Sequence, residues 1–238
     1  MRGVGRLSVS SAALICLAAA HPIFAANIDG RVIIRHRLTK RRVTAAASAY
    51  QRGMTVELDP GIQGDSLSFE RARVVVYLDG EMPAKPVTAT LEQKDRQFGT
   101  DTLVIPAGST VSFPNRDPIF HNVFSLSKPK TFDLGNFPQD HTRNIVFPKA
   151  GIVFVNCHLH PNMAAAIVVS PNQWSTKADD AGRFTLAGVP PGDYTIVAWH
   201  RAAGFFRQRI KVAPNRANFV EFTIPLDENG KSSVVAQR

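Results

Sequence analysis

Four side chains that can bind a metal lie within seven positions of this chain. The heptapeptide "CHLHPNM", residues 157–163, contains Cys157, His158, His160 and Met163. Thiolate, imidazole and thioether groups are the side-chain ligands that soft and borderline transition metals prefer. The residue types and their spacing therefore make this heptapeptide a candidate metal-binding loop.

The sequence around the heptapeptide predicts the elements that would position these donors. The preceding run "GIVFVNC" is apolar on both faces, as a strand buried between two sheets is. Side chains alternate along a strand, so Cys157 shares a face with Val155. Pro161 cannot extend the strand and stiffens a turn, and "AAIVVS" then runs back as the next strand. We expect this turn to bring His160 and Met163 toward the atom that Cys157 faces.

The three donors Cys157, His160 and Met163 need at least one further ligand to complete a site, and His121 is the best candidate. It lies 36 positions before Cys157 in "FPNRDPIFHNVFS", after a turn that contains proline and aspartate. Two imidazoles and one thiolate, with a weak axial thioether, match the trigonal blue-copper site. A closed structural zinc site would use four cysteine or histidine ligands instead. The sequence therefore predicts copper bound by His121, Cys157, His160 and Met163.

The other histidines are expected to be non-ligands. His36, His141 and His200 have no partner at ligand spacing. Neighbouring residues at a strand end point in opposite directions, so we expect His158 to face solvent. The alternative is that His158 acts as a second or competing ligand and changes the metal geometry.

Four motifs in this region together resemble the plastocyanin and amicyanin type of cupredoxin. They are "TLVIPAGSTVSFPN", "DPIFHNVFS", "FPKAGIVFVNC" and "CHLHPNM", and they occur in that order within residues 88–171. The resemblance implies a Greek-key β-sandwich with one type 1 copper ion. It also implies that His121, Cys157 and His160 are the equatorial ligands and that Met163 is axial. By the same resemblance, Asn122 would hydrogen-bond across to the cysteine loop and hold the two ligand loops in register.

The rest of the chain predicts a second β-sandwich. Short β-type runs separated by Gly, Pro, Asn and Asp dominate, which favours an all-β fold. "DDAGRFTLAGVPPGDYTIVAWH" resembles a carboxypeptidase regulatory-like module, a smaller sandwich of the immunoglobulin or transthyretin type. We expect a discontinuous module of residues 27–87 and 172–226 with the cupredoxin inserted at 88–171, and a flexible tail at 227–238. The alternative is a linear order, with an N-terminal extension of the cupredoxin and a separate C-terminal module.

The N-terminus has the pattern of a cleaved signal peptide, residues 1–26. Arg2 and Arg6 precede the apolar stretch 7–20, which is too short to span a bilayer, and small residues follow. Cleavage would remove Arg2 and Arg6 and so lower the formal net charge from +9 to +7. We therefore expect a periplasmic protein without a transmembrane segment.

Cleavage would also leave Cys157 as the only cysteine of the mature chain, because Cys16 lies in the signal. An exported protein normally pairs its cysteines. A single thiol there is either deeply buried or held by a metal, and an internal disulfide is excluded.

A basic stretch follows the signal, with six cations and no acid in "RVIIRHRLTKRRV". The simplest interpretation is a solvated strand or arm. The alternative is attraction to an acidic protein or to a membrane surface. Nucleic acid is not expected, because no aromatic residues are interleaved with these charges.

These features predict an electron carrier rather than an enzyme. Four protein ligands leave no open metal position for a substrate, and the chain has no Ser-His-Asp order and no glycine-rich phosphate loop. The resemblance implies a redox partner, either a quinoprotein dehydrogenase or a cytochrome, as in proteins described as methylamine utilization proteins. The alternative is copper storage, delivery or sensing without electron transfer.

Overall fold

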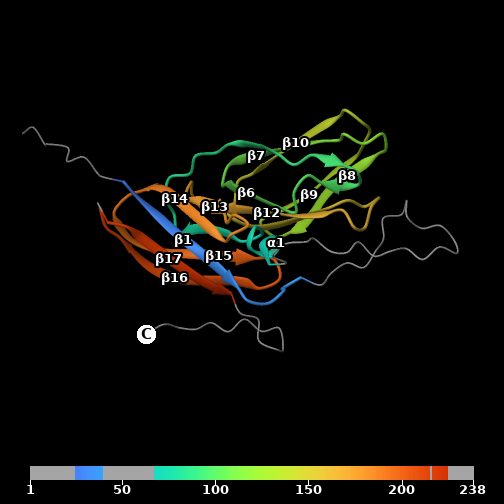
Figure 1. Cartoon of the computed structure of the whole chain (residues 1–238). Helices are drawn as coiled ribbons and strands as arrows, with labels where there is room; N and C mark the ends of the chain where they lie inside the picture. Colours follow the sequence, from blue (N-terminus) through green and yellow to red (C-terminus); the bar gives the residue numbers. More distant parts are fainter. Residues whose placement is uncertain (1–24, 40–66, 215, 225–238) are drawn as a thin grey trace, which may run out of the picture.

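The computed structural model describes residues 25–39, 67–214 and 216–224, whose regular secondary structure consists almost entirely of β-strands. Among these residues, the single α-helix is α1 (Ser68–Arg71). The predicted all-β fold is confirmed. The strands form two sandwiches that lie side by side (Figure 1).

The terminal sandwich takes its strands from both ends of the described chain. Its sheets have the orders β14-β1-β17 and β13-β2-β15-β16. The bounds are β1 (Ala26–Ile34), β2 (Val75–Asp79), β13 (Ser175–Lys177), β14 (Arg183–Val189), β15 (Gly192–His200), β16 (Gly204–Val212) and β17 (Asn218–Ile224). Strand β1 alternates between buried and exposed residues, so Ile28, Val32 and Ile34 pack into the core between the two sheets.

The central sandwich carries the heptapeptide. Its sheets have the orders β10-β7-β3 and β6-β12-β11-β8-β9, and β4 and β5 form a separate hairpin. The bounds are β3 (Thr88–Thr90), β4 (Gln93–Lys94), β5 (Gln97–Phe98), β6 (Thr102–Pro106), β7 (Ser109–Pro114), β8 (His121–Ser127), β9 (Lys130–Phe137), β10 (Thr142–Phe147), β11 (Gly151–Asn156) and β12 (Ala164–Ser170). Phe113, Phe137 and Phe147 fill the core between its sheets, together with Cys157 and Met163.

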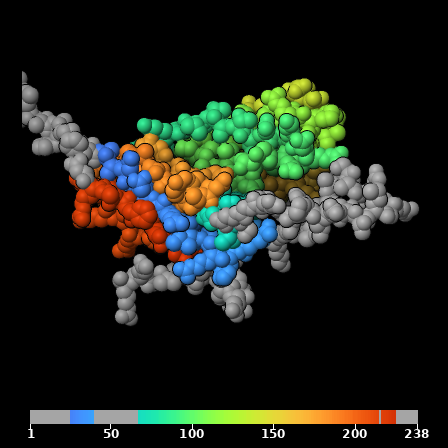
Figure 2. Space-filling model, viewed as in Figure 1, coloured from blue at the N-terminus to red at the C-terminus, as the bar shows by residue number. Residues whose placement is uncertain are grey.

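The two sandwiches pack against each other through an apolar contact. Val75 and Trp199 of the terminal sandwich meet Ala166 and Val168 on the outer face of β12. Figure 2 shows the green part of the central sandwich lying directly beside the orange part of the terminal sandwich. An ion pair between the Arg73 guanidinium and the Asp101 carboxylate spans the same junction. The terminal sandwich therefore covers one part of the outer face of the five-stranded sheet.

The chain enters the terminal sandwich twice. Strands β1 and β2 precede the central sandwich in sequence, yet β1 pairs with β14 and β17, and β2 pairs with β13 and β15. This strand order is the one that an inserted central unit requires. The division at residues 27–87, 88–171 and 172–226 stays a prediction.

Several expectations fall on residues outside the described ranges. They concern nearly all of the predicted signal (1–26), the end of the basic stretch (40–42) and the predicted tail (227–238). Arg31, Arg35 and Arg37 are described, and all three are exposed. Within the described residues, no helix is long and apolar enough to cross a membrane.

A buried pair of ionisable groups connects α1 to the end of β15. His200 Nε2 lies 3.2 Å from Glu70 Oε2, and neither side chain is exposed. His200 Nδ1 accepts the N–H of Ala202, so the ring carries its proton on Nε2, facing the carboxylate. Glu70 Oε1 accepts the N–H groups of Leu38 and Thr39. Burial alone would raise the pKa of Glu70, but the hydrogen bonds from Thr39 and Leu38 hold it below its ordinary value.

The stability of the metal-free protein is expected to decrease as the pH falls from about 7.5 to about 5.5. Burial lowers the pKa of both His200 and His160 from the ordinary value of 6.5. Below that value the unfolded chain binds protons that the folded chain does not bind, which favours unfolding. A group protonated only in the unfolded state changes the free energy of unfolding by about 1.4 kcal/mol per pH unit.

Urea unfolding at several pH values measures this dependence. The variant His200→Gln removes one of the two groups and should show a shallower slope across the same interval. A free energy of unfolding that rises on acidification would contradict the assignment.

Candidate metal centre

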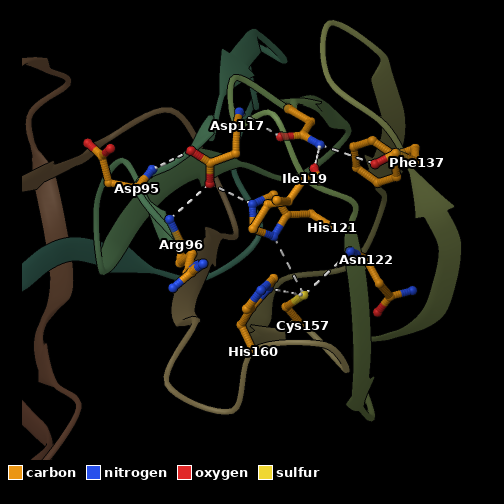
Figure 3. A network of polar contacts seen from close by, with 10 residues as sticks. Asp95, Arg96, Asp117, Ile119, His121, Asn122, Phe137, Cys157 and His160 are labelled. Carbon is orange, nitrogen blue, oxygen red and sulfur yellow. Dashed lines mark hydrogen bonds and ion pairs between the residues drawn. The ribbon is translucent and has the colours of Figure 1, made fainter. Parts of the chain in front are cut away.

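Three of the four predicted ligands converge at one end of the central sandwich. His121 begins β8, Cys157 directly follows β11, and His160 lies in the turn between β11 and β12. Their ligand atoms all lie within 4.8 Å of one another. Cys157 Sγ is 3.9 Å from His121 Nδ1 and 3.7 Å from His160 Nδ1 (Figure 3). Among the described residues, this is the one cluster of three such groups that could hold a metal ion.

The spacing of these atoms fits a single bound ion. Metal bonds of about 2.0 Å to nitrogen and about 2.3 Å to sulfur, set about 120° apart, separate the donor atoms by about 3.7 Å. The two observed Sγ-to-Nδ1 distances, 3.7 and 3.9 Å, are close to this value. Hydrogen bonding alone would not require both imidazoles to turn the same nitrogen toward one sulfur. The donor set therefore fits a metal bound between the three side chains.

Asp117 fixes the orientation of the His121 ring. Its Oδ2 lies 2.6 Å from His121 Nε2, and both side chains are buried. A carboxylate at this distance keeps the ring proton on Nε2 and leaves the lone pair of Nδ1 free for a metal. Asp117 belongs to the loop before β8, and Asn115 holds that loop by donating from Nδ2 to the carbonyl oxygens of Ile119 and Phe137.

Asp117 also binds the β4–β5 hairpin. Asp95 and Arg96 both have positive φ, 54° and 57°, as the two central residues of a tight hairpin turn do. Their backbone N–H groups donate to Asp117 Oδ1 at 2.7 Å and Oδ2 at 2.9 Å (Figure 3). Burial alone would raise the pKa of Asp117, but the Arg96 N–H, the His121 ring and the Asp95 N–H together hold it below its ordinary value. One carboxylate thus connects the hairpin, the ligand loop and the first imidazole.

The sulfur of Cys157 is buried and accepts a backbone hydrogen bond. Its side chain is 4% exposed, and the N–H of Asn122 donates to Sγ at 3.4 Å. Asn122 Oδ1 in turn accepts the N–H of His158 at 3.5 Å. The contact expected from Asn122 to the cysteine loop is therefore present. These bonds hold the two ligand loops in register.

Met163 lies in the same buried region as Cys157. It is 1% exposed and belongs to the core of the central sandwich. Its N–H donates to the carbonyl oxygen of His160 at 2.9 Å, and its carbonyl oxygen accepts the N–H of Cys157 at 3.2 Å. The heptapeptide is thus a closed turn that returns Met163 to the cysteine. Its role as axial ligand stays a prediction.

The remaining histidines lie outside the three-residue cluster. His158 has an exposed side chain that stacks on Phe124, with ring centroids 3.6 Å apart. His36 and His141 are exposed, and His200 is buried against Glu70.

Comparisons with known proteins give partial structural likenesses. No family model matches the chain, and no curated protein matches it. The Cu-containing nitrite reductase NirK from Thermus scotoductus SA-01 is 25% identical, and the match covers 37% of this chain and 22% of that chain with a TM-score of 0.32. The Novel Purple Cupredoxin from Nitrosopumilus maritimus is 23% identical over 34% of this chain and 99% of that chain, with a TM-score of 0.32.

Amicyanin from Paracoccus versutus is also similar to part of the chain. It is 23% identical over 40% of this chain and 97% of that chain, with a TM-score of 0.33. These three solved structures are two cupredoxins and a copper enzyme, each matched over less than half of this chain. The assignment of the metal rests on the donor geometry.

Proposed function

We propose that the protein is a type 1 copper protein that carries electrons. One copper ion would be bound by His121, Cys157 and His160, with Met163 as the axial ligand. The observation that supports this most directly is the convergence of one thiol and two imidazoles within 4.8 Å in a largely buried site. A thiolate with two imidazoles and a buried thioether favours copper over zinc, magnesium or calcium.

Copper would supply a one-electron couple, Cu(I) and Cu(II). The chain would hold the ligands in a buried site whose geometry changes little between these two oxidation states. His121, Cys157 and Met163 are buried, so water is largely excluded from the ligands. The Asp117 carboxylate holds the proton of His121 on Nε2. A site filled by four protein ligands has no position for a substrate, which supports a carrier rather than an enzyme.

The partner would be another redox protein, either a quinoprotein dehydrogenase or a cytochrome, as the sequence resemblance implies. The predicted signal peptide supports a periplasmic location. The resemblance to methylamine utilization proteins supports a role beside a quinoprotein, where this protein would accept or donate one electron at a time.

Copper loading followed by redox cycling tests this function. The mature protein should bind one copper ion, develop an intense visible band and lose it reversibly on reduction with ascorbate. A storage or delivery protein would bind copper without the band or would fail to cycle. Binding of zinc in strong preference to copper would contradict the proposal altogether.

The variant Met163→Gln is expected to keep copper bound and to lower its reduction potential. An amide oxygen is a harder donor than a thioether and favours Cu(II). Cyclic voltammetry measures the shift. The nearby exposed Leu159→Gln is the matched control, because it changes the loop surface without changing a predicted ligand. Equal potentials for wild type and Met163→Gln would argue against axial ligation.

A further inference from the structure

Part of the outer face of the five-stranded sheet remains exposed beyond the terminal sandwich. On this face, Phe124 of β8 pairs with Asn156 of β11 on one side and with Asp133 of β9 on the other. The same antiparallel registers place Leu126 two residues farther along β8, between β11 and β9. Leu126 is 79% exposed, and Phe154 of β11 is 38% exposed. We call this surface of Phe124, Leu126, Phe154 and His158 the outer-sheet patch.

The outer-sheet patch is connected to the copper ligand Cys157. His158 follows Cys157 directly in the chain, and its ring stacks on Phe124 at 3.6 Å with the planes 4° apart. His158 Nε2 lies 3.5 Å from Asp133 Oδ2. Asp133 Oδ1 accepts Asn122 Nδ2 at 2.6 Å, and the Asn122 N–H donates to Cys157 Sγ. A covalent path and a hydrogen-bonded path therefore both lead from the sulfur to an exposed aromatic stack.

The charges around the patch indicate what it would bind. Lys128 lies in the turn that joins β8 to β9 and is exposed. The Arg201 guanidinium lies 5.2 Å above the ring of Phe154, where the terminal sandwich ends. One carboxylate, that of Asp133, lies on the same face and accepts hydrogen bonds from Asn122 Nδ2 and the Gly135 N–H, so the two cations outnumber it. The patch thus combines an apolar centre with a mainly cationic rim.

We propose that the outer-sheet patch is the docking surface for an acidic redox protein, separate from the partly exposed His160 end of the site. This inference rests on the proposed electron-carrier function. In the encounter, the partner's reduced centre would lose one electron, and the site formed by His121, Cys157 and His160 would hold the copper ion that accepts it. No covalent bond breaks, and no proton moves at His158. The cationic rim orients the acidic partner, and the apolar centre forms a contact with the partner from which water is excluded.

Two measurements with the copper-loaded full chain and a c-type cytochrome of net negative charge test the proposal. The first is the second-order rate of electron transfer at low ionic strength. Leu126→Asp should lower this rate about tenfold, because it places a carboxylate in the centre of the contact. Phe219→Asp, on an exposed phenylalanine of the terminal sandwich, should change it by less than about twofold.

The second measurement maps the contact without copper. Carbodiimide cross-linking of the metal-free protein to the same cytochrome should join Lys128 to carboxylates of the partner. Leu126→Asp should reduce the yield of this product, and Phe219→Asp should not.

Two results would overturn the docking surface. One is a large loss of rate in Leu159→Asp, beside His160, with none in Leu126→Asp. The other is cross-linking confined to lysines outside the turn between β8 and β9. A failure of the proposed electron-carrier function would be seen separately, as the loss of reversible reduction by ascorbate in the copper-loaded wild type. The cross-linking of the metal-free protein would still show whether the outer-sheet patch is a docking surface.

Discussion

The variant Cys157→Ser is expected to lose the intense visible absorption of the copper-loaded protein completely. The band of a type 1 site arises from charge transfer between the thiolate and Cu(II), so it requires the sulfur. Serine is nearly isosteric but offers a neutral hydroxyl, which is a poor ligand for copper beside two imidazoles. The affinity for Cu(I), which favours soft sulfur donors, should fall even more than the affinity for Cu(II).

The matched control is the adjacent variant His158→Phe. A phenyl ring can keep the stack on Phe124, and the exposed His158 ring is outside the three-residue cluster. The band should therefore persist in His158→Phe with similar intensity. If Cys157→Ser retained the band, or if His158→Phe lost it, the ligand assignment would be wrong.

The variant Asp117→Ala is expected to weaken copper binding and to destabilise the fold together. Removal of a carboxylate that orients a metal-binding histidine typically costs about 10-fold to 100-fold in affinity. The N–H groups of Asp95 and Arg96 would also lose their acceptor at a turn with positive φ. We expect the free energy of unfolding to fall by about 2–3 kcal/mol from this loss.

Two comparisons separate these effects. Asp117→Asn keeps one carbonyl oxygen for the hairpin but no longer holds a charge beside His121, so it should lose affinity with a smaller loss of stability. Asp140→Ala removes a different carboxylate, which is exposed and pairs with Arg116 at 3.7 Å. Asp140→Ala should change copper affinity little. Unchanged affinity in Asp117→Ala would contradict an orienting role for this carboxylate.

The strands that carry the ligands could be predicted because their signals are local. In "GIVFVNC" the structure places Val153, Val155 and Cys157 on one buried face, as alternation requires, but the other face is only partly covered, because Phe154 is 38% exposed. The chemistry and spacing of His121, Cys157 and His160 likewise predicted the cluster that the structure brings together. These features depend on residue type and short-range periodicity, which the sequence displays directly.

The supporting groups could not be predicted in the same way. Asp117 lies in a loop, and nothing in its neighbourhood of the sequence indicates that it binds both His121 and the N–H groups of residues 95 and 96. Its position four residues before a predicted ligand was the available signal. Strand β9 (Lys130–Phe137) was not predicted, although Phe132 and Leu134 alternate with polar residues.

Long-range pairs were also beyond local reasoning. Glu70 and His200 meet because sheet pairing brings the end of β15 beside α1, a short helix that no periodic pattern indicated. The stack of His158 on Phe124 likewise depends on the register between β8 and β11. Such contacts follow from tertiary arrangement and become visible only with the fold.

The optical and electron paramagnetic resonance spectra of the copper-loaded mature protein test the central claim most directly. A thiolate and two imidazoles in a trigonal plane should give an intense visible band together with a small parallel copper hyperfine splitting. Both should disappear on reduction and return on oxidation. A weak visible spectrum with a large hyperfine splitting would indicate tetragonal nitrogen and oxygen ligation, and it would contradict a type 1 site at His121, Cys157 and His160.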